Sequence, residues 1–240
     1  MCTVTWVHEG DGYQLLCNRD EKRTRARAIA PQVQTRDAVR FIAPIDQDSG
    51  GTWIATNEFG VSLCLLNGAN REPPRDTYTS RGLLVLELVT AQSATEVCER
   101  IWEFNLSVFA PFTLAVLEPG QCTPVIEWNG VEKAIFPYGQ PFLPLTSSSF
   151  DPDGARAGRR ADFLHRLESN VRLDAALLFA FHQSHGPGPD AHSPCMHRPD
   201  AETVSFSWVK VTDSEADFFY TPAAPCKGSP GENKRLLLRQ

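Results

Sequence analysis

The sequence predicts an α+β fold or a layered α/β sandwich built as a single domain. Segments rich in Val, Ile, Leu, Thr and Trp are separated by segments whose apolar residues recur at helical spacing. Their order is strands, helices, strands, helices, strands, which favours sheets covered by segregated helices. The 240 residues, 42% of them hydrophobic, can bury the core of one domain. We expect that domain to span residues 1–240, with an ordered core to about residue 226 and a tail over 227–240.

Two hairpins open the chain. A strand over residues 2–7 and one over 13–17 are joined by the turn signal Asp11-Gly12, and a second pair lies at 52–56 and 61–66. The charged stretch 18–27 between these hairpins is expected to be a loop. Later strands are expected at residues 109–117, 123–128, 131–136, 142–145, 203–212 and 218–221.

Helices are expected in two blocks. Ser80 can cap a buried helix over residues 83–89, and Ser93 with Glu96 forms a capping box before a second amphipathic stretch. The later block is expected to hold helices at residues 159–167 and 173–182, followed by a proline-rich loop at 187–199.

Charge and composition exclude several classes of protein. The net charge of −6 gives little attraction for phosphate backbones, so we expect no nucleic-acid partner. No apolar stretch approaches the roughly 18 residues that span a bilayer, and the first residues lack a secretory signal. The seven cysteines include no CxxC pair. These observations predict a cytoplasmic protein with reduced thiols and no membrane span.

Cys2 is the first candidate for chemistry. Initiator methionine is usually removed when the second side chain is small, which would expose Cys2 with a free α-amine. The amine has a pKa of roughly 8 and the thiol roughly 8.5, so the amine can act as general base for the thiol. The alternative is a buried cysteine in a strand.

Polar residues end two of the predicted strands. The stretch Asn18-Arg19-Asp20-Glu21 follows the second strand, where a carboxylate could orient the α-ammonium and an arginine could anchor an acidic substrate. The alternative is a solvated turn with salt bridges. Asn57 fits a turn that ends in Gly60, and the amide of Asn67 could donate to an oxyanion or simply end its strand.

Together these stretches resemble the NRDE-motif family, also called the Transport and Golgi organisation protein 2 family. The resemblance rests on Cys2, the NRDE tetrad and the residues around Asn57, and it extends to about Cys226. That family is similar in turn to the N-terminal nucleophile hydrolases, in particular bile salt hydrolases and penicillin V acylases. The resemblance implies a four-layer αββα sandwich and cleavage of linear amides.

The resemblance also implies roles for individual residues. Cys2 matches the nucleophile, Asp20 the aspartate beside the amine, and Asn67 the asparagine of the oxyanion hole. Arg19 is expected to bind or polarise, and Asn18 completes the catalytic set. Substrate binding is assigned to Asn57, to Ser147 at the place of a second active-site asparagine, and to Arg160 at the place of a late arginine that Arg159 matches equally well. The hydrolases carry an arginine where this chain has Cys17.

A cluster of potential ligands lies late in the chain at His182, His185, His192, Cys195 and His197. Their types suit zinc or haem iron. The segment 186–194 is rich in Gly and Pro and has no carboxylate fixed nearby, so we expect loop histidines and neither a bound metal nor another cofactor.

Three functions follow as expectations. In the first, Cys2 attacks an amide or thioester of a small-molecule acyl substrate. In the second, the same pocket carries haem or a lipid without catalysis; the family name also implies a role in Golgi organisation and protein secretion.

Overall fold

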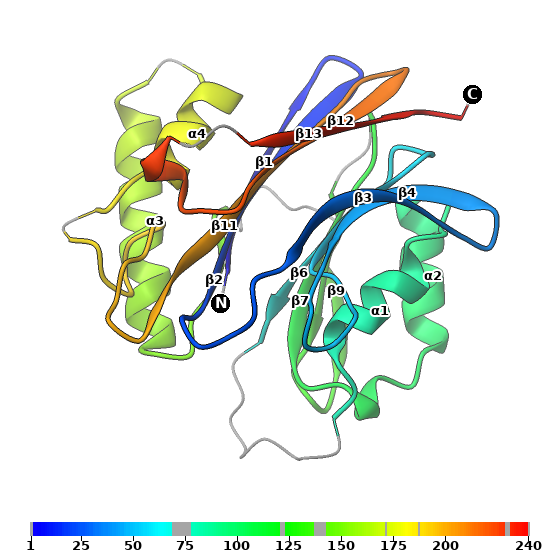
Figure 1. The fold of residues 1–240 in the computed structure, drawn as a ribbon, viewed down its shortest axis with the longest axis horizontal. Helices are drawn as coiled ribbons and strands as arrows, with labels where there is room; N and C mark the ends of the chain where they lie inside the picture. The colour runs from blue at the N-terminus through cyan, green and yellow to red at the C-terminus, as the bar shows by residue number, and fades with distance from the viewer. Residues whose placement is uncertain are drawn as a thin grey trace.

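A computed structural model of the chain describes residues 2–68, 78–120, 123–136, 143–170, 172–186, 188–228 and 231–239. Two antiparallel sheets lie face to face, and each is covered on its outer side by helices (Figure 1). The layers are therefore helix, sheet, sheet, helix, as the family resemblance implied. None of the described helices is long and apolar enough to cross a membrane.

The first sheet has six strands in the order β10-β1-β2-β11-β12-β13. The N-terminal hairpin thus lies inside the sheet, with later strands on both sides. Helices α3 (Pro152–Glu168) and α4 (Ala175–His182) cover its outer face. The strands are β1 (Cys2–Glu9), β2 (Gly12–Lys22), β10 (Leu145–Ser147), β11 (Ala201–Val211), β12 (Glu215–Thr221) and β13 (Glu232–Leu237).

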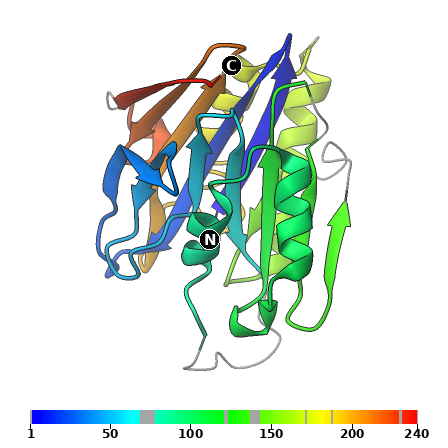
Figure 2. The ribbon, with the colours of Figure 1, turned by 90° about the vertical axis from the view of Figure 1, so that its right-hand side faces the viewer.

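The second sheet has seven strands in the order β3-β4-β5-β6-β7-β8-β9. Helices α1 (Arg81–Leu88) and α2 (Ala94–Glu103) cover it, and Figure 2 shows α2 lying over its strands. The described residues also include two single turns of 3₁₀ helix, η1 (Leu106–Val108) and η3 (Pro225–Lys227). The strands are β3 (Ile29–Arg36), β4 (Val39–Ile45), β5 (Ile54–Asn57), β6 (Ser62–Asn67), β7 (Phe112–Leu117), β8 (Val125–Trp128) and β9 (Lys133–Phe136).

Alternation along β1 decides where Cys2 points. Cys2, Val4 and Trp6 belong to the apolar core between the two sheets. Thr3 and Thr5 face the other way, because their hydroxyls bond to side chains of α3 and α4. Successive strand residues point to opposite faces, so the Cys2 thiol faces the space between the sheets.

The expected loop over residues 18–27 was wrong in its first part, because β2 continues to Lys22. β11 pairs with this segment as far as Lys22, β1 pairs with its first two residues, and Asn18, Arg19 and Asp20 are buried. Backbone pairing therefore keeps a charged sequence in the sheet. Strands β3 and β4 were not predicted, and β13 lies in the stretch expected to be a tail.

Several local predictions are confirmed. The Ser93 hydroxyl accepts a hydrogen bond from the N–H of Glu96, which is the N-cap half of a capping box, whereas the Glu96 carboxylate accepts from the N–H of Gln92. Gly60 has φ +77°, which a residue with a side chain rarely adopts. The predicted cap at Ser80 was wrong in part, because Ser80 stands at the N-cap of α1 but its side chain makes no capping bond. The strand expected at 142–145 begins outside the described residues, and β10 covers Leu145–Ser147.

Candidate active site

Cys2 is the first residue of β1 and lies between β2 and β10. It pairs with Arg19 on one side and with Ser147 on the other. The backbone N–H of Cys2 donates to the Ser147 hydroxyl oxygen at 3.0 Å. The thiol group is nearly buried, with 5% of the residue exposed. Ser147, assigned from the sequence to substrate binding, is thus placed against the nitrogen that would become the α-amine once Met1 is removed.

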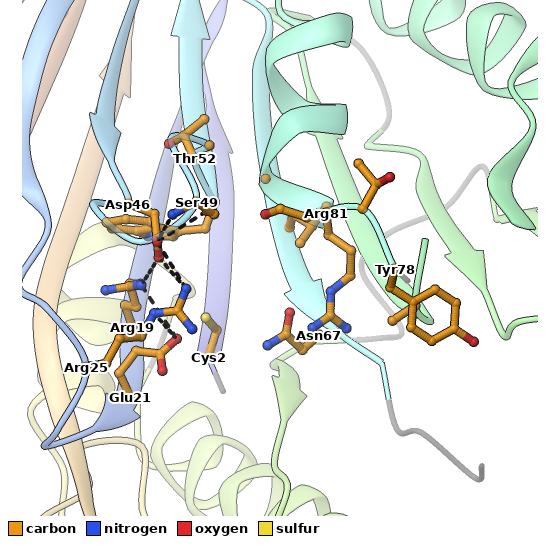
Figure 3. A pocket seen from close by; sticks show the side chains of 17 residues that line it. Cys2, Arg19, Glu21, Arg25, Asp46, Ser49, Thr52, Asn67, Tyr78 and Arg81 are labelled. Atoms are coloured by element: carbon orange, nitrogen blue, oxygen red, sulfur yellow. Dashed lines mark hydrogen bonds and ion pairs between the residues drawn. The ribbon is translucent and has the colours of Figure 1, made fainter. Parts of the chain in front are cut away.

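A pocket of about 400 Å³ opens beside the Cys2 thiol between the two sheets. Figure 3 shows Cys2 on one side of it and Asn67, Arg81 and Tyr78 on the other. A second hollow of about 550 Å³ shares Asn67 and Arg81 with the first and reaches Ser147. The two hollows adjoin, so a small organic molecule could extend from Cys2 toward the outside.

A network of charged side chains forms the wall on the Cys2 side. Arg19 donates to the carboxylate of Asp46 at 2.6 Å, and its guanidinium lies 4.2 Å from the centre of the Trp53 ring. Arg25 donates to the same carboxylate at 2.9 Å and lies near Glu21 (Figure 3). Burial alone would raise the pKa of Asp46, but the bonds from Arg25 hold it below its usual value. Asp46 is therefore ionised at neutral pH.

The thiol of Cys2 is protonated at rest. A hydrogen bond with Cys17, the adjacent thiol on β2, and burial raise its pKa well above the usual value. The negative charge of Asp20 acts in the same direction. A nucleophile in this state needs a base at the moment of attack.

Asp20 lies on the opposite face of the sheet from the thiol. Its carboxylate accepts from Thr203 at 2.6 Å and from Arg159 at 3.2 Å, and both side chains of the ion pair are fully buried. Arg159 also donates to the Cys2 carbonyl at 3.4 Å and to the Thr3 hydroxyl at 2.7 Å. Asp20 therefore reaches Cys2 through Arg159, and the pair holds the start of β1 in place.

The structure separates the two late arginines that the sequence could not distinguish. Arg159 contacts Cys2 as described, whereas its neighbour Arg160 is exposed and donates to the carbonyl of Leu143 at 3.0 Å. Arg160, assigned to substrate binding, is not among the described residues that line either hollow.

Asn18 and Asn57 point away from the pocket. The Asn18 amide donates to the carbonyls of His182 and Pro194, behind the first sheet. The Asn57 amide donates to two carbonyls after α1, and its oxygen accepts from Phe59 and Val61 within the turn. Both side chains hold loops in place. Of the asparagines proposed for chemistry, Asn67 is the one that lines the pocket.

Arg81 was not predicted from the sequence. It is the first residue of α1, and its guanidinium donates to the Pro111 carbonyl at 2.7 Å while lining both hollows. Burial lowers its pKa from the usual value. No carboxylate within the described parts of the chain lies at ion-pair distance from it. No local pattern marks a lone arginine at a helix start as part of a site, so the sequence carried no signal for it.

The late histidines divide into different environments. His182 is fully buried and bonds to the Thr5 hydroxyl at 2.9 Å, and burial lowers its pKa to about 3. His192 lies at the surface with its ring between Asp151 and Asp190. Neither ring faces the pocket. His185 and His197 lie together near two cysteines, away from the residues that line the pocket.

Several solved structures have an architecture similar to that of this chain. The chain is similar to a penicillin V acylase from Agrobacterium tumefaciens (TM-score 0.57, 12% identity, 99% of this chain and 86% of the other covered). It is also similar to an N-acylethanolamine-hydrolyzing acid amidase ortholog from Caenorhabditis elegans (TM-score 0.61, 12% identity, 100% of both chains). The C2A mutant of the conjugated bile acid hydrolase from Clostridium perfringens matches with TM-score 0.59, 12% identity and 99% and 92% coverage.

These likenesses show that the chain has the fold of the N-terminal nucleophile hydrolases, with a cysteine at the head of the first strand. The family model described as Transport and Golgi organisation 2 matches residues 1–135. The chain belongs to this family. No curated protein matches its sequence.

Proposed function

We propose that the protein hydrolyses an acyl bond, an amide or a thioester, in a small-molecule substrate, with Cys2 as nucleophile after removal of Met1. The observation that carries the proposal is the position of Cys2. Its thiol adjoins a pocket between the sheets, its nitrogen lies 3.0 Å from the Ser147 hydroxyl, and Asn67 lies across the pocket.

The chemistry would follow from these positions. The α-amine of Cys2 takes the proton of the thiol, and the sulfur attacks the substrate carbonyl carbon. The Asn67 amide and a backbone N–H donate to the oxyanion that forms. The amine then returns the proton to the leaving amine or thiol as the carbon–heteroatom bond breaks. Water, deprotonated by the same amine, releases the acid from the Cys2 thioester.

The other residues support this arrangement. The Ser147 hydroxyl accepts from the Cys2 nitrogen and so orients it. Arg159, held by Asp20, fixes the backbone of Cys2. The protonated state of the resting thiol suits a mechanism in which the neighbouring amine is the base.

We further propose that the substrate carries an acidic or strongly polar group next to Arg81. The arginines on the Cys2 side already bond to Asp46, whereas Arg81 donates to a neutral carbonyl. A carboxylate or phosphate accepts bonds from a guanidinium in a fixed geometry.

We place this activity in the cytoplasm, where free thiols persist; the six cysteines within the described residues are all free.

The first test is the intact mass of untagged protein, followed by a screen of N-acyl amides and acyl thioesters. We expect Met1 to be absent and Cys2→Ala to abolish turnover. Cys98→Ala, at a half-buried cysteine on α2, should retain full activity. A mass that includes Met1, or turnover that survives Cys2→Ala, would overturn the mechanism.

Two further variants separate the roles across the pocket. Asn67→Ala should lower kcat by about 10²–10³-fold, as loss of an oxyanion donor does. Arg81→Gln should raise KM for acidic substrates and leave neutral ones unaffected. Arg156→Gln, at a largely exposed position on α3, is the matched control. Equal effects of Arg81→Gln on acidic and neutral substrates would refute the charge assignment without touching the mechanism.

A further inference from the structure

Four potential metal ligands meet behind the first sheet, between the end of α4 and η3. One donor atom from each of His185, Cys195, His197 and Cys226 lies within 4.8 Å of the others. The His197 Nε2 atom lies 3.5 Å from the Cys195 sulfur and 3.2 Å from the Cys226 sulfur. The rings of the two histidines are 5.2 Å apart and steeply inclined, at 65°.

These distances are close to those of a tetrahedral zinc centre. With Zn–S of about 2.3 Å and Zn–N of about 2.0 Å, the edges of the tetrahedron measure about 3.3–3.8 Å. The contacts of His197 with the two sulfurs are near this range, and the largest separation of 4.8 Å exceeds it by about 1 Å. Small side-chain rotations would therefore close the four donors around one ion.

A second, independent observation points to a ligand. The Nε2 atom of His185 is buried and has no hydrogen-bond partner within the described structure. A buried polar atom left without a partner destabilises the folded state, and nearly all such atoms in folded proteins are satisfied. A metal ion at the centre of the cluster would provide the missing partner.

The backbone around the cluster is held independently of any ion. The N–H of Cys195 donates to the Ser184 carbonyl at 2.9 Å, and the N–H of His197 donates to the Pro189 carbonyl at 3.0 Å. The Gln183 side chain donates to the Pro225 carbonyl at 3.1 Å, which joins the end of α4 to η3. The donors come from three segments that are already fixed beside one another.

We propose that His185, Cys195, His197 and Cys226 form a structural site for a zinc-type divalent metal ion. Thiolate and imidazole donors select such ions over magnesium or calcium. Two thiolates balance the charge of the ion, and four protein donors leave no open position for substrate, which is typical of structural sites. None of the four is among the described residues that line the pocket beside Cys2.

The site would link α4, the loop before β11 and η3. Ala191 and Met196 of this loop form a small apolar cluster with Ala201, the first residue of β11. A metal ion bound to all three segments would add its binding free energy to the stability of the folded state. This role is independent of the acyl chemistry proposed above and stands if no substrate is ever found.

The test is metal analysis of protein purified without a histidine tag under reducing conditions. We expect about one zinc ion per chain, as purified or after reconstitution with Zn²⁺, and near zero in Cys195→Ser and Cys226→Ser. The matched controls are Cys98→Ser and His192→Gln, which change a cysteine and a histidine outside the cluster and should keep full occupancy.

If the serine variants fail to fold, binding of Co²⁺ to the unmutated protein still tests whether the thiolates bind a metal ion. Tetrahedral Co²⁺ with thiolate ligands gives intense visible bands and a thiolate-to-metal charge-transfer band, which we expect at one equivalent of Co²⁺. The proposal is overturned if wild-type protein binds neither ion, if both serine variants keep their zinc, or if Cys195 and Cys226 are joined by a disulfide in the reduced preparation.

Discussion

Two adjacent arginines on α3 allow a sharp test of how the first sheet is held to its helices. Arg159 is fully buried and forms an ion pair with the buried carboxylate of Asp20, while Arg160 is exposed. Arg159→Ala and Arg160→Ala make the same chemical change one residue apart in the same helix. Helix propensity is therefore matched, and a difference in stability reports the environment alone.

The contacts of each arginine set the expected loss in the free energy of unfolding. Arg159→Ala removes bonds to Asp20, Thr3, Ala191 and the Cys2 backbone, and leaves a buried carboxylate without its cation. Breaking one partner of a buried pair costs about 3–5 kcal/mol. Arg160→Ala should cost less than about 1 kcal/mol, as exposed charges do.

Urea unfolding followed by circular dichroism measures the difference. With a slope of about 2–3 kcal/mol per molar, the Arg159→Ala midpoint should fall by about 1–2.5 M. The Arg160→Ala midpoint should stay within about 0.5 M of wild type, which is the shift that 1 kcal/mol produces at this slope. Equal midpoints for the two variants would refute the argument that the buried pair anchors β1.

Three further predictions concern other parts of the structure. Cys17→Ala should lower the pKa of Cys2, because the hydrogen bond that the Cys2 thiol donates to Cys17 is the largest cause that raises it, and alkylation of Cys2 should become faster at neutral pH. Asn57→Ala should lower the free energy of unfolding by more than about 2 kcal/mol, since it leaves buried backbone groups unpaired. His192→Gln should remove a pH-dependent stabilisation. Contact with Asp151 raises the pKa of His192, so the stabilisation is full below about pH 6.5 and disappears as pH rises through the raised value. The same contact lowers the pKa of Asp151, so it also disappears as pH falls below about 4.

For each of these three predictions, one experimental outcome would contradict the reasoning. Unchanged alkylation of Cys2 across a pH series, followed by peptide mass mapping, would refute the effect of Cys17. Loss of Cys2 alkylation in folded Asn57→Ala protein would place Asn57 in the site after all. A melting-temperature difference between wild type and His192→Gln that persists unchanged at pH 8 would exclude the ion pair with Asp151 as its source.

The N-terminal hairpin and the helix at Ser93 could be predicted from the sequence because their signals are local. Cys2 and Asn67 were selected for chemistry and both line the pocket. Strand β13 could not be found, because Glu232–Leu237 is half charged and is stabilised by pairing with β12 at the edge of the sheet. Strand β3 mixes polar residues and a proline, and its position depends on β4.

Several site residues likewise could not be predicted from the sequence, because their positions depend on how helices and strands pack. Choosing between Arg159 and Arg160 requires the rotation of α3 about its axis, since neighbouring helix residues differ by about 100° in direction. The part played by Arg81 depends on where α1 lies against the other sheet. Asn18 and Asp20 turned out to face the helices because β2 extends through them, which a charged sequence did not indicate.

The position of the N-terminal hairpin inside the first sheet has a consequence for synthesis of the protein. β2 pairs with β11, which begins at Ala201, so its edge has no partner until that segment leaves the ribosome. At about 5–20 residues per second, the 179 residues from Lys22 to Ala201 take about 10–40 s to translate. Throughout that interval β2 is paired with β1 on one edge alone, and charged side chains on an open edge disfavour pairing with other chains. The charged side chains that later line and support the pocket thus also place charge on the open edge of the nascent hairpin.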